Sequence, residues 1–456
     1  MFRKIHQIHF VGIGGSGMSG IAEVLLNLGY KVTGSDLRVS DTTRRLESKG
    51  GKIYTGHAPL HIEGAQVIVT SSAVSKNNVE VRAAIERHIP VIPRAEMLAE
   101  LMRMKYSIAI AGSHGKTTTT SMVATVLAQA GFDPTVVLGG KLNVLGSNAK
   151  LGQGEFLVAE ADESDGSFLL LSPTIAVVTT IDKEHIDHYK DMDNIKKGFL
   201  NFINKVPFYG MAVICLDQPN IKALIPQITK RYMTYSIEDP DADLCAGEIR
   251  LNEWRSEFHV SYKKEDMGRF RLSLPGLHSV YNALAAIGVA IELEIDIEAI
   301  KEGLSGFSGV ERRFQLKGEK NGVMVIDDYG HHPTEIEVTL NALKGAWDRR
   351  VIALFQPHRF TRTRDLMEEF AYAFNNADIL LLTEIYPAGE EPIKGISGQR
   401  LYEYIKENGK CKDIFFIEKK EDIVEKLLKL LKPNDIVITL GAGDIWKIGK
   451  ELLERL

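Results

Sequence analysis

Short apolar runs alternate with amphipathic stretches along most of the chain. The first run, Ile5 to Val11, leads into a glycine cluster, a helical pattern covers Ile21 to Leu28, and a second run follows at Lys31 to Gly34. Runs of about four to eight apolar residues are typical of buried strands, and a period of about 3.6 residues is typical of helices. The order predicts a β-α-β unit. Further strands are predicted at residues 66–70 and 89–92.

The same order begins again after a break near residue 105. Pro90 and Pro93 interrupt the first section before a helical pattern at residues 95–104. Tyr106 to Ala111 then has the pattern of a buried strand, followed by the loop GSHGKTT and a helical pattern. Later elements of this section are predicted as strands at residues 155–160, 174–181 and 211–215 and as a helix at residues 279–293.

From Gly322 onward, apolar strand patterns alternate with helical segments, which is typical of a doubly wound sheet. These strands are predicted at residues 323–326, 351–355, 379–382, 414–417 and 436–440. The chain has 456 residues, and domains usually contain about 100 to 200 residues. We therefore predict three α/β domains in series, at residues 1–105, 106–313 and 314–456. The outer two are expected to be Rossmann-like, and the middle one P-loop ATPase-like.

Composition limits the classes of function. Hydrophobic residues make up 44% and charged residues 25% of the chain, and 55 Lys and Arg against 60 Asp and Glu leave a net charge of −5. This is ordinary globular composition, and it does not indicate a nucleic-acid partner. Any anionic ligand must therefore be met by a local basic patch.

The cysteine content and the N-terminus favour a cytoplasmic protein. Cys215, Cys245 and Cys411 are too far apart for a zinc or CxxC spacing, and such a sparse count is typical of a reducing compartment. The N-terminus reaches a glycine loop before a signal-peptide core could form, and no run approaches the roughly 18 apolar residues of a membrane span. We expect a soluble protein without membrane insertion.

A glycine fingerprint lies in the first β-α turn. Gly12, Gly14 and Gly17 form GxGxxG, and Asp36 ends the next strand at the usual distance for an acidic ribose ligand. Glycines let the backbone approach a diphosphate at a helix N-terminus. The pattern indicates a nucleotide diphosphate, with a simple tight turn as the alternative, and it leaves the nucleotide open.

A second phosphate-type loop opens the middle section. In GSHGKTT, Gly112 and Gly115 flank the turn, Lys116 can reach β- and γ-phosphates, and the hydroxyl of Thr117 can ligate Mg²⁺. The general pattern GxxxxGK[ST] would need glycine where Ile110 stands, so this loop is shorter. Its place between a strand and a helix nevertheless favours phosphate binding over a chance match.

Carboxylates follow two later strands of the same section. Glu160 ends one strand and begins the acidic segment EADESD, and His185 lies in the segment DKEHIDH after the strand at residues 174–181. Hard oxygen ligands suit Mg²⁺. Such a cluster is otherwise a solvated turn, and the upstream phosphate loop favours the metal.

Two local basic patches lie further along. Arg312 and Arg313 precede Phe314, and HRFTRTR follows the strand at residues 351–355. The planar guanidinium group suits carboxylates or phosphates. A solvated helix face is an equally good explanation for Arg364, but a weaker one for Arg359 at a strand end.

Taken together, these motifs resemble the bacterial Mur ligase family over essentially the whole chain. The matching pieces are HFVGIGGSGMSGIAEVL, GSHGKTTTT, AEADESDGSF, GVERRF, DDYGHHPTE and FQPHRFTRT. The short GSHGKTT loop is the family's own form. One departure is HSxxN at His278 to Asn282, where the family often has HNxxN, and it leaves a contact at Ser279 in doubt.

The resemblance implies an ATP-dependent amide ligase that joins L-alanine to the lactyl carboxylate of UDP-N-acetylmuramate through an acyl phosphate, in cytoplasmic peptidoglycan precursor synthesis. Mg²⁺, with Mn²⁺ as a possible substitute, would assist. Carried over by position, the UDP-sugar would contact Gly12, Gly14, Gly15, Ser16, Gly17, Asp36, His57, Ser71 and Ser72. ATP would contact Gly112, Ser113, His114, Gly115, Lys116, Thr117, Thr118, Asn282, Arg313 and Asp328.

The resemblance also assigns the remaining roles. The amino acid would lie at Tyr329, His331, Arg359 and Arg362; metal ligands would be Thr117, Glu160 and His185; catalytic residues would be Lys116, His185 and His331. A sister ligase that adds a tripeptide to the same UDP-sugar is the nearest alternative. An NAD(P)-dependent oxidoreductase, suggested by GxGxxG and Asp36 alone, and a binding module switched by ATP hydrolysis are alternatives from other classes.

Overall fold

The computed structural model of the protein describes residues 5–71, 73–142 and 147–456. Within these ranges the strands form three sheets, and the chain divides into two compact units. The first unit comprises the chain up to Ile249 with residues 258–271 and 280–308. The second comprises residues 250–257, 272–279 and 309–456.

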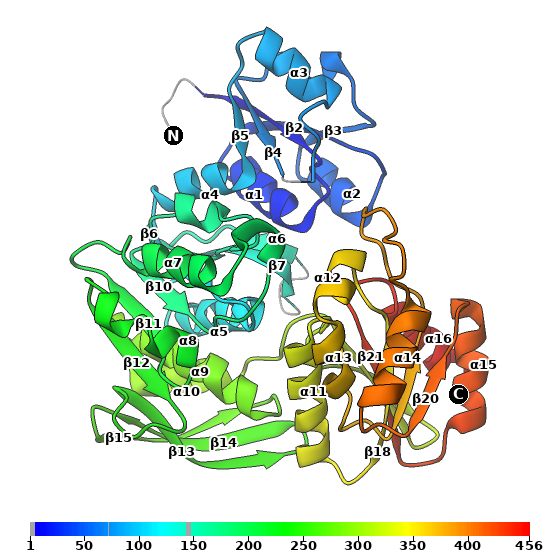
Figure 1. The fold of residues 1–456 in the computed structure, drawn as a ribbon. Coiled ribbons are helices and arrows are strands. Elements are labelled where there is room, and N and C mark those ends of the chain that lie inside the picture. Colours follow the sequence, from blue (N-terminus) through cyan, green and yellow to red (C-terminus); the bar gives the residue numbers. More distant parts are fainter. Residues whose placement is uncertain (1–4, 72, 143–146) are drawn as a thin grey trace. The chain divides into compact units, whose positions relative to one another are not determined.

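The N-terminal sheet is parallel and has the strand order β3-β2-β1-β4-β5. In Figure 1, α3 lies on one face of this sheet and α1 and α4 lie on the other. The chain order reverses between β2 and β4 around β1, and ligands of such sheets bind at the carboxyl edge beside this point. Its elements are β1 (Gln7–Val11), α1 (Ser16–Asn27), β2 (Lys31–Asp36), α2 (Asp41–Ser48), β3 (Lys52–Thr55), the 3₁₀ turn η1 (Pro59–Ile62), β4 (Val67–Thr70), α3 (Val79–Glu86), β5 (Val91–Pro93) and α4 (Arg94–Met102).

The middle sheet has the order β15-β14-β13-β12-β11-β10-β6-β9-β7-β8. β6 lies between β10 and β9 and pairs in parallel with both, so the loop after β6 opens at the carboxyl edge. Its strands are β6 (Tyr106–Ala111), β7 (Thr135–Leu142), β8 (Ser147–Lys150), β9 (Phe156–Glu160), β10 (Ile175–Val178), β11 (Met211–Cys215), β12 (Tyr232–Ser236), β13 (Leu244–Asn252), β14 (Arg255–Tyr262) and β15 (Glu265–Leu272). Its helices are α5 (Lys116–Gln129), α6 (Ile186–Tyr189), α7 (Met192–Ile203), α8 (Pro219–Lys222), α9 (Leu277–Glu292) and α10 (Ile297–Ser305).

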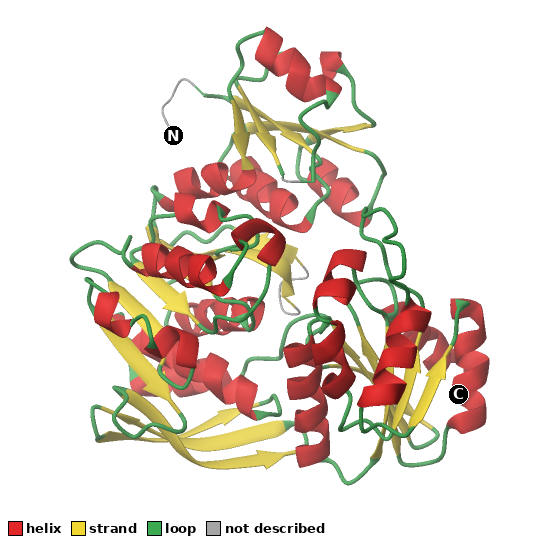
Figure 2. Cartoon of the chain, viewed as in Figure 1, coloured by secondary structure: helices red, strands yellow, loops and turns green. Residues whose placement is uncertain are grey.

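The C-terminal sheet has the order β16-β17-β21-β18-β19-β20. β16 is antiparallel to β17, and the remaining neighbouring strands pair in parallel. Helices cover both faces of this sheet (Figure 2). Its elements are β16 (Gln315–Lys320), β17 (Val323–Asp328), α11 (Pro333–Ala346), β18 (Arg350–Phe355), α12 (Phe360–Asp365), α13 (Met367–Ala373), β19 (Ile379–Leu382), α14 (Gly398–Asn408), β20 (Asp413–Phe416), α15 (Ile423–Leu430), β21 (Asp435–Leu440) and α16 (Trp446–Arg455).

Alternation along β17 shows how the sequence builds the two layers of this domain. Met324 and Ile326 belong to the apolar cluster that includes Leu340 of α11, whereas Val323 and Val325 belong to the cluster on the other face. Successive side chains of a strand point to opposite faces, so a continuous apolar run is buried on both sides. Among the described residues, no helix combines the length and apolarity of a membrane span.

Candidate active site

A carboxylate on a neighbouring strand shapes the N-terminal glycine loop. Gly12 has a φ of +77°, which glycine adopts without strain. The backbone N–H of Gly14 donates to Asp36 Oδ2 at 2.8 Å, and a methyl group on Gly14 would lie 2.8 Å from that oxygen. The loop ends at the N-terminus of α1, whose exposed N–H groups favour an anion. The structure thus brings together the predicted Gly12, Gly14 and Asp36.

The other UDP-sugar candidates lie along the same edge of the sheet. Gly15 is the N-cap residue of α1. His57 follows β3 and Ser71 follows β4, and both strands are parallel to the rest of the sheet. The side chain of Ser16 and the whole of Ser72 lie outside the described residues.

An arginine links this glycine loop to the acidic segment of the middle domain. Arg94 Nη2 of α4 donates to Asp162 Oδ2 at 2.9 Å. A methyl group on Gly17 would lie 2.7 Å from Arg94 Nη1, so the guanidinium group packs directly against this glycine. Asp162 precedes Glu163, so Arg94 anchors the acidic segment beside the start of α1.

The phosphate loop has close contacts that require its glycines. Gly112 has a φ of +140°, and a methyl group there would lie 2.1 Å from Thr179 Oγ1. Gly115 is the N-cap residue of α5 with a φ of +80°. A methyl group on Gly115 would lie 2.5 Å from Asn282 Oδ1. The loop therefore wraps tightly against its neighbours and leaves its N–H groups at the start of α5.

The Lys116 side chain folds back over this loop. Its Nζ donates to Gly112 O at 2.5 Å, to Ser113 O at 3.2 Å and to Glu163 Oε1 at 2.8 Å. The attraction of Glu163 and Glu184 raises the pKa of Lys116 although burial opposes this. Lys116 is therefore a fixed cation at the position predicted for the phosphates.

Contacts with the end of β10 hold the other loop residues. Ser113 Oγ accepts from Asp182 N at 2.8 Å, and His114 Nε2 lies 3.2 Å from Asp182 Oδ2. Thr117 and Thr118 lie in the first turn of α5, and Thr117 is buried. The predicted loop residues therefore form one local structure at the carboxyl edge of the sheet.

Glu163 is the carboxylate that faces the loop. It is buried, and burial raises its pKa to about 7 against the opposing attraction of Lys116. Its backbone carbonyl accepts a hydrogen bond from Tyr189 Oη at 2.6 Å, which fixes the segment. Among the described residues, Glu163 Oε2 has no hydrogen-bond partner, so one buried carboxylate oxygen remains available for a ligand.

Two further groups converge on Glu163. Ligand atoms of Glu163, Glu184 and His185 lie within 4.8 Å of one another, and His185 Nε2 is 3.8 Å from Glu163 Oε1. Glu160, the predicted metal ligand, ends β9 in register with Ile110 and does not belong to this group. Glu163 is therefore a further candidate metal ligand in the acidic segment, and the assignments of Glu160 and His185 stay predictions.

Asn282 of α9 lies against the phosphate loop. Its Oδ1 accepts from Thr119 Oγ1 at 3.2 Å and approaches Gly115 closely, and the residue is buried. A contact with adenine stays a prediction. In this structure the side chain braces the loop.

In the second unit, the adjacent Arg312 and Arg313 make different polar contacts. Arg312 donates to Asp327 Oδ2 at 3.0 Å and to the carbonyls of Gly441 and Gly443, so it holds β17 to the loop after β21. Arg313 lies over the ring of Tyr329, with its Cζ 5.1 Å from the ring centroid. Arg312 Cζ lies at the same distance of 5.1 Å from that centroid, so both arginines border Tyr329, and the contact of Arg313 with ATP stays a prediction.

Asp328 ends β17 as a buried carboxyl group. It accepts from Phe314 N at 2.7 Å and from Gly330 N at 2.6 Å. Burial raises its pKa to about 6, although Arg313 and these N–H groups oppose the shift. Asp328 thus shapes the turn that carries Tyr329, and its predicted contact with ATP stays untested.

The predicted amino-acid residues gather around His358, which sequence reasoning did not single out. The ring centroids of His331 and His358 are 5.7 Å apart, and Arg362 Nη1 lies 3.3 Å from His358 Nδ1. Burial, with the charges of His331 and Arg362, lowers the pKa of His358 to about 3. His358 also stacks on Tyr386 at 5.6 Å. Arg359 is exposed and has a φ of +72°.

Comparisons with known proteins agree with this arrangement. Residues 7–106 match the family described as "Mur ligase family, catalytic domain", residues 110–290 match "Mur ligase middle domain", and residues 312–443 match "Mur ligase, glutamate ligase domain". Together these ranges cover most of the chain. The chain belongs to the Mur ligase family. The predicted family and the predicted three-domain α/β fold are confirmed.

Several relatives match this Mur ligase over its whole length. The UDP-N-acetylmuramate–L-alanine ligase of Geotalea uraniireducens is 60% identical over 456 residues, which are 100% of this chain and 99% of the relative. The crystal structure of UDP-N-acetylmuramate-alanine ligase from Thermotoga maritima has a TM-score of 0.82 at 28% identity and covers 98% of both chains. A murein peptide ligase from Psychrobacter arcticus has a TM-score of 0.72 at 25% identity with the same coverage.

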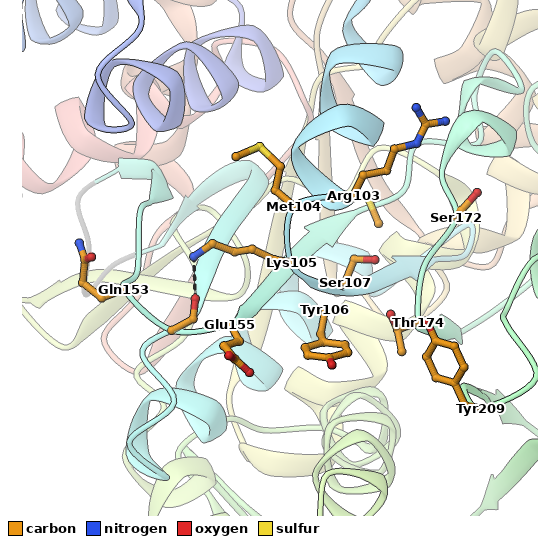
Figure 3. Close-up of a pocket in the computed structure, with 12 residues that line it drawn as sticks. Arg103, Met104, Lys105, Tyr106, Ser107, Gln153, Glu155, Ser172, Thr174 and Tyr209 are labelled. Carbon is orange, nitrogen blue, oxygen red and sulfur yellow. Dashed lines mark hydrogen bonds between the residues drawn. The ribbon is translucent and has the colours of Figure 1, made fainter. Parts of the chain in front are cut away.

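A pocket of about 570 Å³ lies at the opposite edge of the middle sheet of this Mur ligase (Figure 3). It opens where β6 and β9 begin, and Tyr106 and Tyr209 line it. Lys105 crosses it and donates to the carbonyls of Gly152 and Gly154 at 2.9 Å and 2.7 Å. None of the predicted site residues lines the pocket, so it is separate from the phosphate loop.

Sequence reasoning missed residues that act through long-range contacts. Arg94 and Glu163 are separated by many residues from the groups they touch, as His358 is from His331 and Tyr386. A fourth such residue, Glu80, lies on α3. For Glu163 a signal existed, because it lies in the quoted segment AEADESDGSF, but spacing alone could not distinguish it from Glu160. For the others, only the folded chain reveals the contact.

Proposed function

We propose that this Mur ligase joins L-alanine to the lactyl carboxylate of UDP-N-acetylmuramate, with hydrolysis of ATP to ADP and phosphate, in the cytoplasmic synthesis of peptidoglycan precursors. The observation that carries the proposal is the fixed Lys116 in the phosphate loop, facing Glu163 at 2.8 Å. The choice of substrates rests on full-length relatives that are named UDP-N-acetylmuramate–L-alanine ligase.

The loop favours transfer of the γ-phosphoryl group. A lysine and helix N–H groups at a phosphate loop stabilise charge on β- and γ-phosphates. The lactyl carboxylate oxygen would form a bond to the γ-phosphorus while the bond to the β-bridging oxygen breaks, releasing ADP. The alanine amine, after losing a proton, would then attack the acyl carbon, and phosphate would leave with its electron pair. His185 and His331 are the candidates to take the proton.

The residues at the loop fit a divalent cation. The unpartnered buried oxygen of Glu163, together with Glu184 and His185, offers the mixed oxygen and nitrogen donors of a site that binds Mg²⁺ or Mn²⁺. The hydroxyl of Thr117 would complete the set from α5. When bound, the cation would neutralise charge on the phosphate oxygens.

Release of ADP with different acceptors tests the proposal. With UDP-N-acetylmuramate and ATP, L-alanine should be the best of the amino acids, and a tripeptide should be a poor acceptor. A preference for the tripeptide would favour the sister ligase that adds a tripeptide to the same UDP-sugar. ATP turnover without UDP-sugar or amino acid would favour a nucleotide-switched module.

Labelled substrate tests the order of bond changes. If the carboxylate is the nucleophile, ¹⁸O placed in the lactyl carboxylate must appear in the released phosphate. Mass spectrometry of the phosphate would detect it. Unlabelled phosphate would exclude the acyl phosphate, and AMP among the products would exclude γ-phosphoryl transfer.

Asp36→Ala is expected to abolish UDP-sugar binding. The carboxylate holds the loop through Gly14 N, so its loss removes both the loop contact and a ribose acceptor. Calorimetric titration with UDP-N-acetylmuramate measures the effect, and the exposed Asp41→Ala in α2 serves as the matched control. Unchanged affinity in Asp36→Ala, or tight NAD binding by the wild type, would contradict the assignment.

Replacement of Arg362 by lysine is expected to raise the KM for L-alanine by about tenfold and to leave the KM for ATP nearly unchanged. A lysine keeps the charge but cannot form the forked pair with a carboxylate. The same result is expected for Arg359→Lys. Arg364→Lys is the control, because Arg364 pairs with Asp365 at the surface. Equal changes in both KM values would assign the arginines to phosphate instead.

A further inference from the structure

Glu80 is a fully buried carboxylate in the first turn of α3. It accepts from Ser35 Oγ at 2.5 Å, lies 3.1 Å from His57 Nδ1 and lies 2.7 Å from His61 Nδ1. The backbone N–H of Ala58 donates to it at 3.3 Å. Side chains and backbone from three separate segments of the N-terminal domain therefore meet at one carboxylate.

Glu80 is ionised in this setting. Burial would raise its pKa, but the nearby imidazole of His9 and the hydrogen bonds from Ser35 and His61 lower it to about 2. An ionised carboxylate can only accept hydrogen bonds. His57 and His61 must therefore donate to Glu80 from Nδ1, which fixes the tautomer of each ring when it is neutral.

The two histidines differ in how else they are held. The ring of His61 stacks on Tyr54 with a centroid distance of 4.1 Å and an interplanar angle of 4°. His57 Nδ1 is bound by Glu80 and by Ser35 Oγ at 3.0 Å. The orientation of His57 thus depends directly on the Glu80 cluster.

His57 lies beside the glycine loop. It follows β3, and the backbone N–H of Gly56 donates to Asp36 O at 2.7 Å. The carboxylate of the same Asp36 holds Gly14 of the loop. The side chain of His57 is 19% exposed, whereas that of Glu80 is fully covered, so His57 is the member of this pair that a ligand can reach.

We propose that Glu80 is a positioning residue of the UDP-sugar site, acting through His57. By holding Nδ1–H of His57, Glu80 leaves Nε2 as the acceptor for an N–H or hydroxyl of the nucleoside. The inference rests on the proposed function, because it takes the N-terminal loop to bind a nucleoside diphosphate. It adds a residue from α3 that the glycine fingerprint does not contain.

Glu80→Gln tests the positioning role, with Glu86→Gln on the exposed end of the same helix as the control. Calorimetric titration with UDP should show affinity about tenfold weaker in Glu80→Gln, as expected for loss of a charged hydrogen bond, and unchanged in Glu86→Gln. The KM for UDP-N-acetylmuramate should rise by a similar factor, with kcat and the KM for ATP unchanged. A lower Tm with unchanged UDP affinity would mean that Glu80 is only structural.

A double-mutant cycle tests whether the effect passes through His57. His57→Asn keeps a donor near the position of Nδ1 but removes Nε2. If Glu80 acts through His57, Glu80→Gln should weaken UDP binding less than twofold further in the His57→Asn background. A full tenfold loss in that background would contradict the inference.

Ser35→Ala provides a second, milder variant in case Glu80→Gln does not fold. It removes the hydroxyl that joins Glu80 to His57, and a loss of about threefold in UDP affinity is expected. Unchanged affinity would contradict the positioning role. Wild-type protein that does not bind UDP would overturn the proposed function itself. Equal UDP affinity of wild type and Glu80→Gln would overturn this inference alone.

Discussion

Lys116→Ala is expected to lower the rate of ADP release by about 10³-fold or more, while UDP-sugar affinity stays within twofold of the wild type. Charge stabilisation on transferring phosphates is commonly worth this much. Lys116 Nζ donates to Gly112, Ser113 and Glu163, all in the middle domain, so UDP-sugar binding at the N-terminal sheet should persist. The variant should also fold, because Glu163, whose pKa is already about 7, can take up a proton when its partner is lost.

Lys105→Ala is the matched control for this prediction. Lys105 also donates to two backbone carbonyls, but at the opposite edge of the same sheet (Figure 3). The Lys105→Ala variant should lose some stability and keep its rate of ADP release. Measurement of ADP release, UDP-sugar affinity and Tm for both variants distinguishes a loss of phosphate binding from a loss of stability. Near-normal turnover in Lys116→Ala would remove Lys116 from the phosphate site.

The architecture and both loops could be predicted because their signals are local. Tyr106 to Ala111, Met211 to Cys215 and Ile379 to Leu382 are strands with the predicted bounds, since strands buried on both faces appear as unbroken apolar runs. The phosphate loop combines a strand, glycines and a lysine within a few residues. Each of these patterns is fixed by neighbours in sequence.

The strands β13 to β15 were not predicted, and the reason is their exposure. β13 has exposed positions over most of its second half, so its apolar pattern is weak. β14 carries a clearer signal, because Ser256, Phe258 and Val260 alternate as buried positions. A search for period-two alternation, beyond apolar runs, would have found β14.

The acidic segment shows where sequence reasoning ends. Glu160 ends the strand and was the natural choice, but the chain continues past the strand and brings Glu163 over Lys116. Glu184 and His185 come from another loop after β10. Which carboxylate of EADESD meets them depends on the loop path, which no spacing within the segment encodes.

Glu163→Gln is expected to lower kcat on the order of 100-fold and to raise the Mg²⁺ concentration needed for half-maximal activity by at least about tenfold. Glutamine preserves the size of the buried side chain but loses the charge. The charge is required because Oε1 faces Lys116 at 2.8 Å, whereas Oε2 is the buried oxygen without a hydrogen-bond partner in the described part of the chain. A neutral amide would also place an N–H group near a cation.

Glu160→Gln decides between the two carboxylates of the acidic segment. Glu160 lies three positions before Glu163, at the end of β9. It is outside the group formed by Glu163, Glu184 and His185. Binding of Mn²⁺ in the absence of ATP, followed by electron paramagnetic resonance, reports the metal site independently of turnover. If Glu163 is the ligand, Mn²⁺ affinity falls in Glu163→Gln and stays unchanged in Glu160→Gln. The reverse pattern would restore Glu160 as the ligand, and loss in neither variant would place the cation on other residues.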